Sequence, residues 1–206
     1  MMQAEKIAAE IYRSLSAAKL AQVESSARHA HLCAKDMETL FGKGARLTPK
    51  RMLSQKGEFL SEERVTVISE RRTIQNVAIL GPLRPESQVE LSLTDGVSLG
   101  LKLPVRISGD IAGTPGIILC TEIGEARLDY GCIAAMRHLH AAPAEAAMLG
   151  LVENQLISVE VFGSRKVVFN DMPVRIKDSF RLRVHLDMDE ANAAGLDGFT
   201  LGRLIY

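Results

Sequence analysis

The sequence contains no tryptophan and few other aromatic residues, with six phenylalanines and three tyrosines in 206 residues. Charge of either sign is also not in excess, because 25 lysines and arginines balance 25 aspartates and glutamates. A chain without net positive charge has no global field to attract nucleic acid or an anionic membrane. No basic cluster is interleaved with aromatic residues either. We therefore expect a protein that binds neither nucleic acid nor a membrane.

Cysteine is scarce, and its spacing excludes a disulfide framework. Cys33, Cys120 and Cys132 are odd in number and form no C-x-x-C pair, which is typical of a reducing cytoplasm. Uninterrupted apolar runs are only a few residues long, far short of the ~20 needed to span a bilayer. The first twenty residues also lack the continuous apolar segment of a secretory signal. These absences predict a cytoplasmic protein.

The N-terminal segment, residues 1–20, has the pattern of an amphipathic helix, and neither glycine nor proline interrupts it. The apolar residues at three- and four-residue steps are Ala4, Ile7, Ala8, Ile11, Leu15 and Ala18. Two interpretations remain open. The helix packs on its own domain, or it is a docking peptide that buries its apolar stripe against a partner.

From Val23 onward the apolar pattern changes to a period of two. The predicted strands are Val65–Ile68, Val77–Leu80, Val89–Leu93, Gly116–Leu119, Leu156–Phe162, Val167–Phe169, Val174–Ile176 and Phe180–Leu186. The predicted helices are short, at Lys35–Phe41, Pro143–Leu149 and Asp189–Ala194, and a glycine follows each. Many short strands separated by turn residues favour a mainly β barrel or sandwich over a parallel α/β sheet.

The five histidines are the most informative feature of the chain. Four of them form two His-x-His pairs, His29 with His31 and His138 with His140, and His185 stands alone. Alternate residues of a strand point to the same face, so each pair offers two imidazoles to one point. Imidazole is the commonest metal ligand, and three protein ligands with one open position characterise catalytic zinc. An arginine precedes each pair, and a short predicted helix and then a glycine follow it. This similarity is a faint internal repeat. The pattern predicts a metalloenzyme with two metal positions.

Candidates for the missing third ligands come from the strand faces. Alternation places His185 on a polar strand face, and it places Glu90 away from the core with Gln88 and Ser92. Taken alone, both residues are more typical of a solvated surface. Arg84 lies in a proline-flanked turn, where a guanidinium could bind phosphate bidentately, but taken alone it is more typical of a surface arginine.

Five ordered segments together resemble the PduL-type phosphotransacylases, the phosphate propanoyltransferases associated with bacterial microcompartments. The resemblance runs from about Val23 to Leu196. Its segments are Ser26–Leu32, Leu80–Arg84, Gln88–Asp95, Arg137–His140 and His185–Gly195.

The resemblance implies a mainly β fold of two tandem β-barrel domains capped by short α-helices, with the active site between them, after the N-terminal helix. One barrel would combine residues 21–27 with 136–206, and the other would comprise residues 28–135. It also implies two zinc ions per chain. Position by position, His29, His31 and Glu90 would bind one ion, and His138, His140 and His185 the other. Arg84 matches the arginine placed beside the phosphate.

The implied reaction converts acyl-CoA, with propionyl-CoA expected, and phosphate into acyl phosphate and free coenzyme A, and the reverse. One metal would stabilise the departing CoA sulfur, while the other, with Arg84, would orient phosphate. The resemblance further implies propanediol degradation inside a bacterial microcompartment, with shell or cargo proteins as partners of the N-terminal helix. We also expect a homodimer.

Two other functions are compatible with parts of the pattern. A mononuclear cupin-like oxygenase is also a β-barrel with a His-x-His strand, but it leaves the second pair and His185 unexplained. A non-catalytic, zinc-stabilised microcompartment scaffold would bind metal without releasing CoA. An amidohydrolase barrel also begins with His-x-His but needs ~250 residues and repeated βα units.

Overall fold

The computed structural model describes residues 2–206, and most of its regular structure is β-strand, as predicted. Five helices and fifteen strands are present in this part of the chain. The chain divides into two compact units. The barrel unit comprises the chain up to Ser26, Arg137–Leu186 and Glu190–Tyr206, and the curled-sheet unit comprises Ala27–Met136 and Asp187–Asp189.

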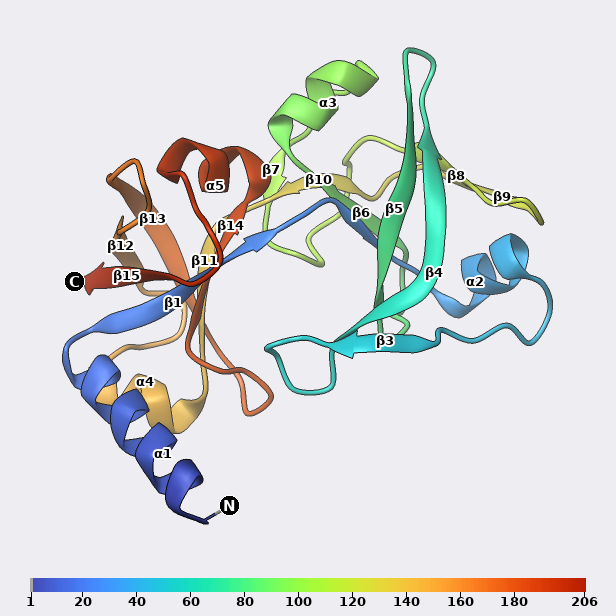
Figure 1. Cartoon of the computed structure of the whole chain (residues 1–206). Helices are drawn as coiled ribbons and strands as arrows, with labels where there is room; N and C mark the ends of the chain where they lie inside the picture. Colours follow the sequence, from blue (N-terminus) through green and yellow to red (C-terminus); the bar gives the residue numbers. More distant parts are fainter. Residues whose placement is uncertain (1) are drawn as a thin grey trace. The chain divides into compact units, whose positions relative to one another are not determined.

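Six strands of the barrel unit close on themselves in the order β1-β14-β11-β13-β12-β15 (Figure 1). Their bounds are β1 Leu20–Ser26, β11 His138–Ala141, β12 Leu156–Val161, β13 Val167–Ile176, β14 Arg183–Asp187 and β15 Thr200–Ile205. Alternate residues fill the interior, including the fully buried Leu139, Val159 and Val184. Closure leaves the unit without a free sheet edge.

The prediction of separate strands at Val167–Phe169 and Val174–Ile176 was wrong, because β13 is continuous through both. Its register against β12 shifts between the pairs Ile157–Met172 and Val159–Phe169, and Asp171 has a φ of 54°. Such a bulge interrupts the alternation of side chains without ending the strand. The apolar pattern of the sequence is therefore interrupted at the bulge, although the strand continues through it.

The curled-sheet unit is built on the path β7-β10-β6-β2-β5-β4-β8-β9, with β3 paired to β4. These strands are β2 His29–His31, β3 Pro49–Met52, β4 Phe59–Ile68, β5 Thr73–Gly81, β6 Gln88–Leu91, β7 Val105–Arg106, β8 Ile117–Cys120, β9 Glu125–Leu128 and β10 Cys132–Ala135. Leu32, Ile79 and Leu119 are fully buried in its core. The second predicted barrel thus takes the form of a half-barrel sheet.

Helices are short apart from the first. They are α1 Met2–Ala17, α2 Ala34–Phe41, α3 Leu93–Leu99, α4 Pro143–Leu149 and α5 Met188–Ala194. Three of them agree with the predicted helices. The helix α3 was not predicted, and Leu93, expected at the end of a strand, begins it. Ser92 caps α3 by accepting a hydrogen bond from the Asp95 backbone N–H. The helix was missed in spite of this capping pattern because it contains a glycine and β-branched residues, which have low helix propensity.

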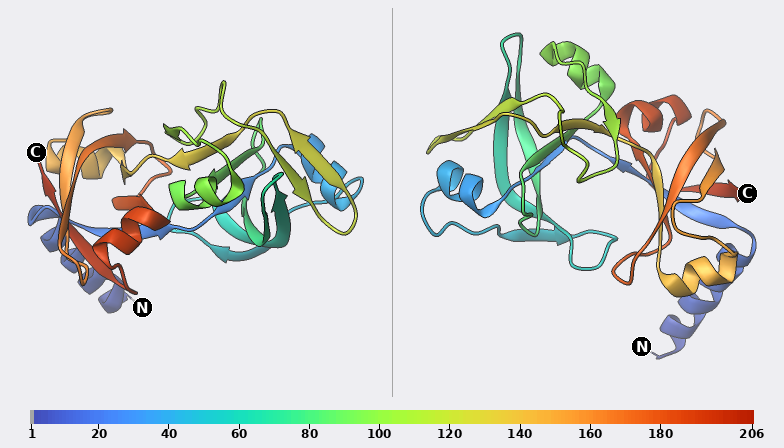
Figure 2. Two further views of the ribbon diagram at one scale, coloured as in Figure 1. Left: turned by 90° about the horizontal axis from the view of Figure 1, so that it is seen from above. Right: turned by 180° about the vertical axis from the view of Figure 1, so that it is seen from behind.

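The N-terminal helix is shorter than predicted, because Leu20 already belongs to β1 and Lys19 has a positive φ of 56°. Met1 lies outside the described residues. The helix contacts α4 and β1 (Figure 2). Ile7 and Ile11 nevertheless remain more than half exposed, so a docking role stays a prediction. Across residues 2–206, no helix combines the length and apolar character that crossing a membrane requires.

Candidate metal centres

The first His-x-His pair lies on β2, beside the antiparallel strand β6. The register places Glu90 directly opposite His29 and Gln88 opposite His31. These side chains share one face, while Ala30 and Val89 point to the core from the other. The His29 Nε2 atom is 3.5 Å from Glu90 Oε2, and His31 Nε2 is 3.7 Å from Glu90 Oε1. The predicted trio therefore converges, and all three side chains are buried.

Backbone carbonyls orient both imidazoles of this trio. The Nδ1 atom of His29 is 2.8 Å from the Ala27 carbonyl oxygen, and that of His31 is 3.2 Å from the Leu80 carbonyl oxygen. A histidine that donates through Nδ1 presents Nε2 as a lone pair, the arrangement found at most protein metal sites.

The electrostatics of this trio favour an ionised carboxylate. Burial alone would raise the pKa of Glu90, but His29, His31 and a hydrogen bond from Ser108 hold it well below its ordinary value. Burial lowers the pKa of His31 to about 3, with a further contribution from the charge of His29. Burial also acts to lower the pKa of His29, but the Glu90 carboxylate outweighs it and raises that pKa. His31 is therefore a neutral ligand at pH 7 and Glu90 an anionic one.

Arg84 lies close enough to this trio for its charge to lower the pKa values of both histidines. Its Nη1 atom donates to the Ser108 hydroxyl at 2.8 Å, and its backbone N–H donates to the Leu32 carbonyl at 2.9 Å. The arginine is half-buried. These hydrogen bonds fix the positive charge of Arg84 beside the trio.

Two residues of this centre were missed at the sequence level. Gln88 was predicted on the same strand face as Glu90, but no role followed from that position. Ser108 lies in the loop after β7 and donates to Glu90 Oε1 at 2.6 Å. No local pattern marks a serine in a loop as the neighbour of a glutamate eighteen residues earlier.

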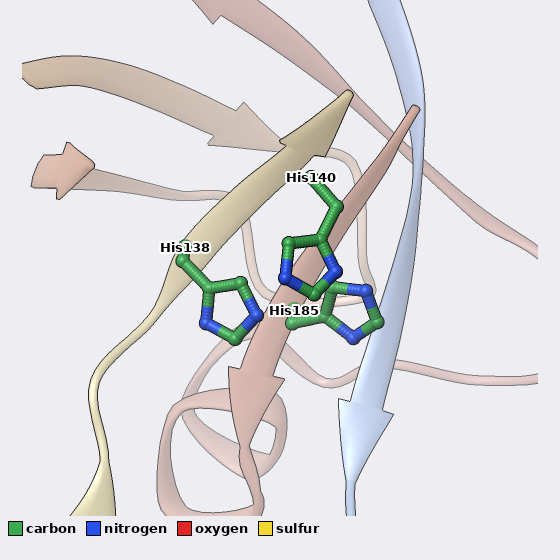
Figure 3. A group of neighbouring side chains, drawn as sticks. All are labelled: His138, His140 and His185. Carbon is green, nitrogen blue, oxygen red and sulfur yellow. The ribbon is translucent and has the colours of Figure 1, made fainter. Parts of the chain in front are cut away.

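The second pair lies on β11, beside the antiparallel strand β14. The register places His185 directly opposite His138, and Arg183 opposite His140. Leu139 and Val184 occupy the opposite face, in the barrel core. Figure 3 shows the three imidazoles turned toward one another. The ring centroids of His138 and His140 are 4.3 Å apart, and those of His140 and His185 are 4.8 Å apart.

Phe180 covers one face of His140, with ring centroids 3.7 Å apart and an interplanar angle of 19°. The sequence predicted a strand from Phe180 to Leu186, but β14 begins only at Arg183, so the predicted start was wrong. Phe180 precedes β14 in a turn closed by a hydrogen bond from its N–H to the Lys177 carbonyl. Strand alternation does not apply in such a turn, so the ring reaches the histidine face instead.

His140 is more suited to act as a metal ligand than as a base. Burial lowers its pKa, and the neighbouring His138, His185, Arg175 and Lys177 charges lower it further. Among the described residues, its Nδ1 is the buried side-chain nitrogen that lacks a hydrogen-bond partner. A neutral imidazole with a buried nitrogen that lacks a hydrogen-bond partner is suited to binding a cation.

Both trios fit a metal ion by donor type and by geometry. Within each trio, one potential ligand atom per residue lies within 4.8 Å of the others. Two imidazoles with a carboxylate, and three imidazoles, are both ligand sets of catalytic zinc. Each site is built from a His-x-His strand and a third residue opposite the first histidine.

A sequence model of a protein family, described as phosphate propanoyltransferase, matches residues 22–197. The phosphate propanoyltransferase of Clostridioides difficile is 41% identical over 200 residues, which cover 97% of this chain and 96% of the relative. The protein of the same name from Listeria monocytogenes is 44% identical over 89% of this chain and 86% of its own length. That of Thermotoga maritima is 42% identical over 96% of this chain and 93% of its own length.

Proposed function

The chain belongs to the phosphate propanoyltransferase family and is a phosphate acyltransferase, and we propose that it is a zinc-dependent one acting on propionyl-CoA. Family membership favours a transferase over the cupin-like oxygenase and the scaffold. The observation that carries the zinc proposal is the shared design of the two trios. In each, the antiparallel neighbouring strand carries a side chain with a potential ligand atom opposite the first histidine.

The reaction exchanges a carbon–sulfur bond for a carbon–oxygen bond. A phosphate oxygen attacks the carbonyl carbon of the thioester, the bond from that carbon to sulfur breaks, and coenzyme A leaves as the thiolate. The proton lost by phosphate balances the one that the thiolate takes up. The reverse direction passes through the same steps.

The six ligands would divide between the two units. His29, His31 and Glu90 would bind one zinc in the curled-sheet unit, and His138, His140 and His185 would bind the other in the barrel unit. When bound, zinc supplies Lewis acidity that favours the thiolate form of CoA and polarises the thioester oxygen. Because Glu90 would contribute a negative charge and imidazole ligands contribute none, the three-histidine site would keep more of the positive charge of a bound ion.

Arg84 would bind the phosphate that attacks the thioester. A guanidinium carries five N–H donors, and here one nitrogen donates to Ser108, so donors remain for two phosphate oxygens. A half-buried position strengthens this attraction relative to bulk water. Arg84 thereby orients the nucleophile and offsets negative charge that develops in the transition state.

The test is an assay of thiol release from acetyl-, propionyl- and butyryl-CoA, each with and without phosphate and with and without a zinc chelator. We expect release that needs phosphate, is lost with chelator, and is fastest with propionyl-CoA. Zinc restored after chelation should restore activity. Release that is independent of zinc would overturn the metal role, and a faster rate with another acyl chain would overturn the assigned substrate.

The exposed apolar side chains of α1 suit a partner surface, and we propose that this partner is a microcompartment shell protein. Ile7 and Ile11 are 52% and 56% exposed, and both lie on the predicted apolar stripe. An Ile7→Ser/Ile11→Ser variant should keep thiol release but no longer co-sediment with assembled shells. Equal co-sedimentation of the variant and the unchanged protein would contradict this role.

A further inference from the structure

We propose that Ser108 is a positioning residue that ties the phosphate-binding Arg84 to the metal ligand Glu90 through a single hydroxyl group. The inference rests on the proposed function and adds a residue to it. All groups involved lie in the curled-sheet unit.

The hydroxyl of Ser108 uses its full hydrogen-bonding capacity. It donates to Glu90 Oε1 at 2.6 Å and accepts from Arg84 Nη1 and Gln88 Nε2, each at 2.8 Å. A hydroxyl has one proton to donate and two lone pairs. Every one of them is engaged, so the hydroxyl has a single orientation, and its two functional neighbours are fixed relative to each other.

Gln88 holds the loop that carries Ser108. Its Oε1 atom accepts a hydrogen bond from the Gly109 backbone at 2.9 Å, and its Nε2 atom donates to both Ser108 and Glu90. Gln88 is 2% exposed and lies opposite His31. The strand that supplies the metal ligand therefore also fixes the loop that supplies the hydroxyl.

These contacts also distinguish the two oxygens of the Glu90 carboxylate. Oε1 accepts from Ser108 and Gln88, which occupies both of its lone pairs. Oε2 accepts from neither residue and lies 3.5 Å from His29 Nε2, while Oε1 lies 3.7 Å from His31 Nε2. We infer that Oε2 would bind the metal while Oε1 anchors the carboxylate, so loss of the Ser108 hydroxyl removes one of the two hydrogen bonds that hold the carboxylate in place.

The position of Ser108 separates this role from a general effect on folding. Ser108 is half-buried in a loop and does not belong to the hydrophobic core. Removing its hydroxyl takes from Arg84 the acceptor of its Nη1 atom and leaves Oε1 of Glu90 with one donor, Gln88, in place of two. Loss of such an outer partner of a metal ligand costs roughly tenfold to a hundredfold in metal affinity or activity.

The experiment compares Ser108→Ala, Ser108→Thr and Ser61→Ala with the unchanged protein. Ser61 is a matched control, because it is a fully buried serine of the same unit whose hydroxyl donates to the Ile79 carbonyl. Zinc affinity is measured by competition with a chromophoric chelator, and KM is measured separately for phosphate and for propionyl-CoA.

Ser108→Ala should bind zinc roughly tenfold to a hundredfold more weakly and raise the KM for phosphate more than that for propionyl-CoA. Ser108→Thr, which keeps the hydroxyl, should restore both quantities, and Ser61→Ala should change neither. In the Arg84→Ala background, removal of the Ser108 hydroxyl should still weaken zinc binding but should lower kcat/KM for phosphate much less.

Unchanged zinc affinity in Ser108→Ala would overturn the proposal, as would equal impairment of Ser108→Thr and Ser108→Ala. Failure of the proposed function has a different signature. In that case the unchanged protein itself would bind no zinc at the Glu90 site or release no CoA with phosphate.

Discussion

Glu90 lies directly opposite His29 in the antiparallel pair of β6 and β2, and Oε2 of the glutamate is 3.5 Å from Nε2 of the histidine. The same relationship recurs between His185 and His138 in β14 and β11. Residues directly opposite each other in an antiparallel pair have neighbouring Cβ atoms. One cross-strand position thus completes both trios, with a carboxylate in one unit and an imidazole in the other.

Replacing Glu90 by glutamine should remove one zinc equivalent per chain. A neutral amide is a poorer zinc ligand than a carboxylate, and the buried site offers no substitute among the described residues. Zinc per chain is measured by elemental analysis after gel filtration. Glu62→Gln, which changes an exposed glutamate paired with Lys50, should keep the full zinc content. Full retention of zinc in Glu90→Gln would contradict the assignment.

The matched change in the barrel unit is His185→Ala, which should also remove one zinc equivalent while leaving the Glu90 site loaded. A double variant with Glu90→Gln should contain no zinc, because the ligands of the two sites are separate residues. If His185→Ala lost all zinc by itself, the two sites would not be independent.

Replacing Arg84 by alanine should lower kcat/KM for phosphate by roughly 10²–10³-fold, because a preorganised charge at the nucleophile is lost. Zinc content should stay normal, since Arg84 binds no metal. Arg84→Lys should recover only part of the rate, because an ammonium cannot form the bidentate contact. The measurements are steady-state thiol release and elemental analysis. Zinc loss in Arg84→Ala would contradict the role given to the arginine.

Phe180 should affect zinc affinity only at the site in the barrel unit. No hydrogen bond fixes Nδ1 of His140, so the stacked ring of Phe180 is what holds the imidazole plane. Phe180→Ala should weaken zinc binding by about tenfold, in line with the loss of other outer-shell partners. Phe180→Tyr keeps an aromatic ring and should bind zinc normally. Chelator competition on the Glu90→Gln background reports the barrel site alone, and equal affinities of Phe180→Ala and Phe180→Tyr would refute the prediction.

The buried Cys132 should resist alkylation in the folded protein. Burial raises the pKa of its thiol to about 12, so it stays protonated at pH 8, and the reactive thiolate is scarce. We expect iodoacetamide at pH 8 to leave Cys132 unmodified until urea unfolds the chain. Peptide mass spectrometry measures the modification at each cysteine. Rapid labelling of Cys132 without urea would show that this part of the core opens readily.

Local sequence patterns predicted much of the secondary structure and the shared strand face of each histidine pair. A period of two indicated β-strands, and the same period places His29 with His31, and His138 with His140, on common strand faces. Helix α4 has its predicted bounds, Pro143–Leu149, because proline at its start and a glycine after its end are local signals. These properties depend on neighbours within a few residues, which is why the sequence alone predicts them.

Other features depend on residues far apart in the chain. The opposition of Glu90 to His29 depends on the register between two strands about sixty residues apart, which no local pattern specifies. The family resemblance implied that the two residues share a site. Likewise, the contact of Ser108 with Arg84 and Glu90 depends on the path of a loop, and the stacking of Phe180 depends on a turn. The sequence by itself determined which residue types could bind metal and which pairs share a face. Only the tertiary structure decided which side chain lies opposite each pair and which contacts support it, because long-range strand register and loop paths result from packing of the whole unit.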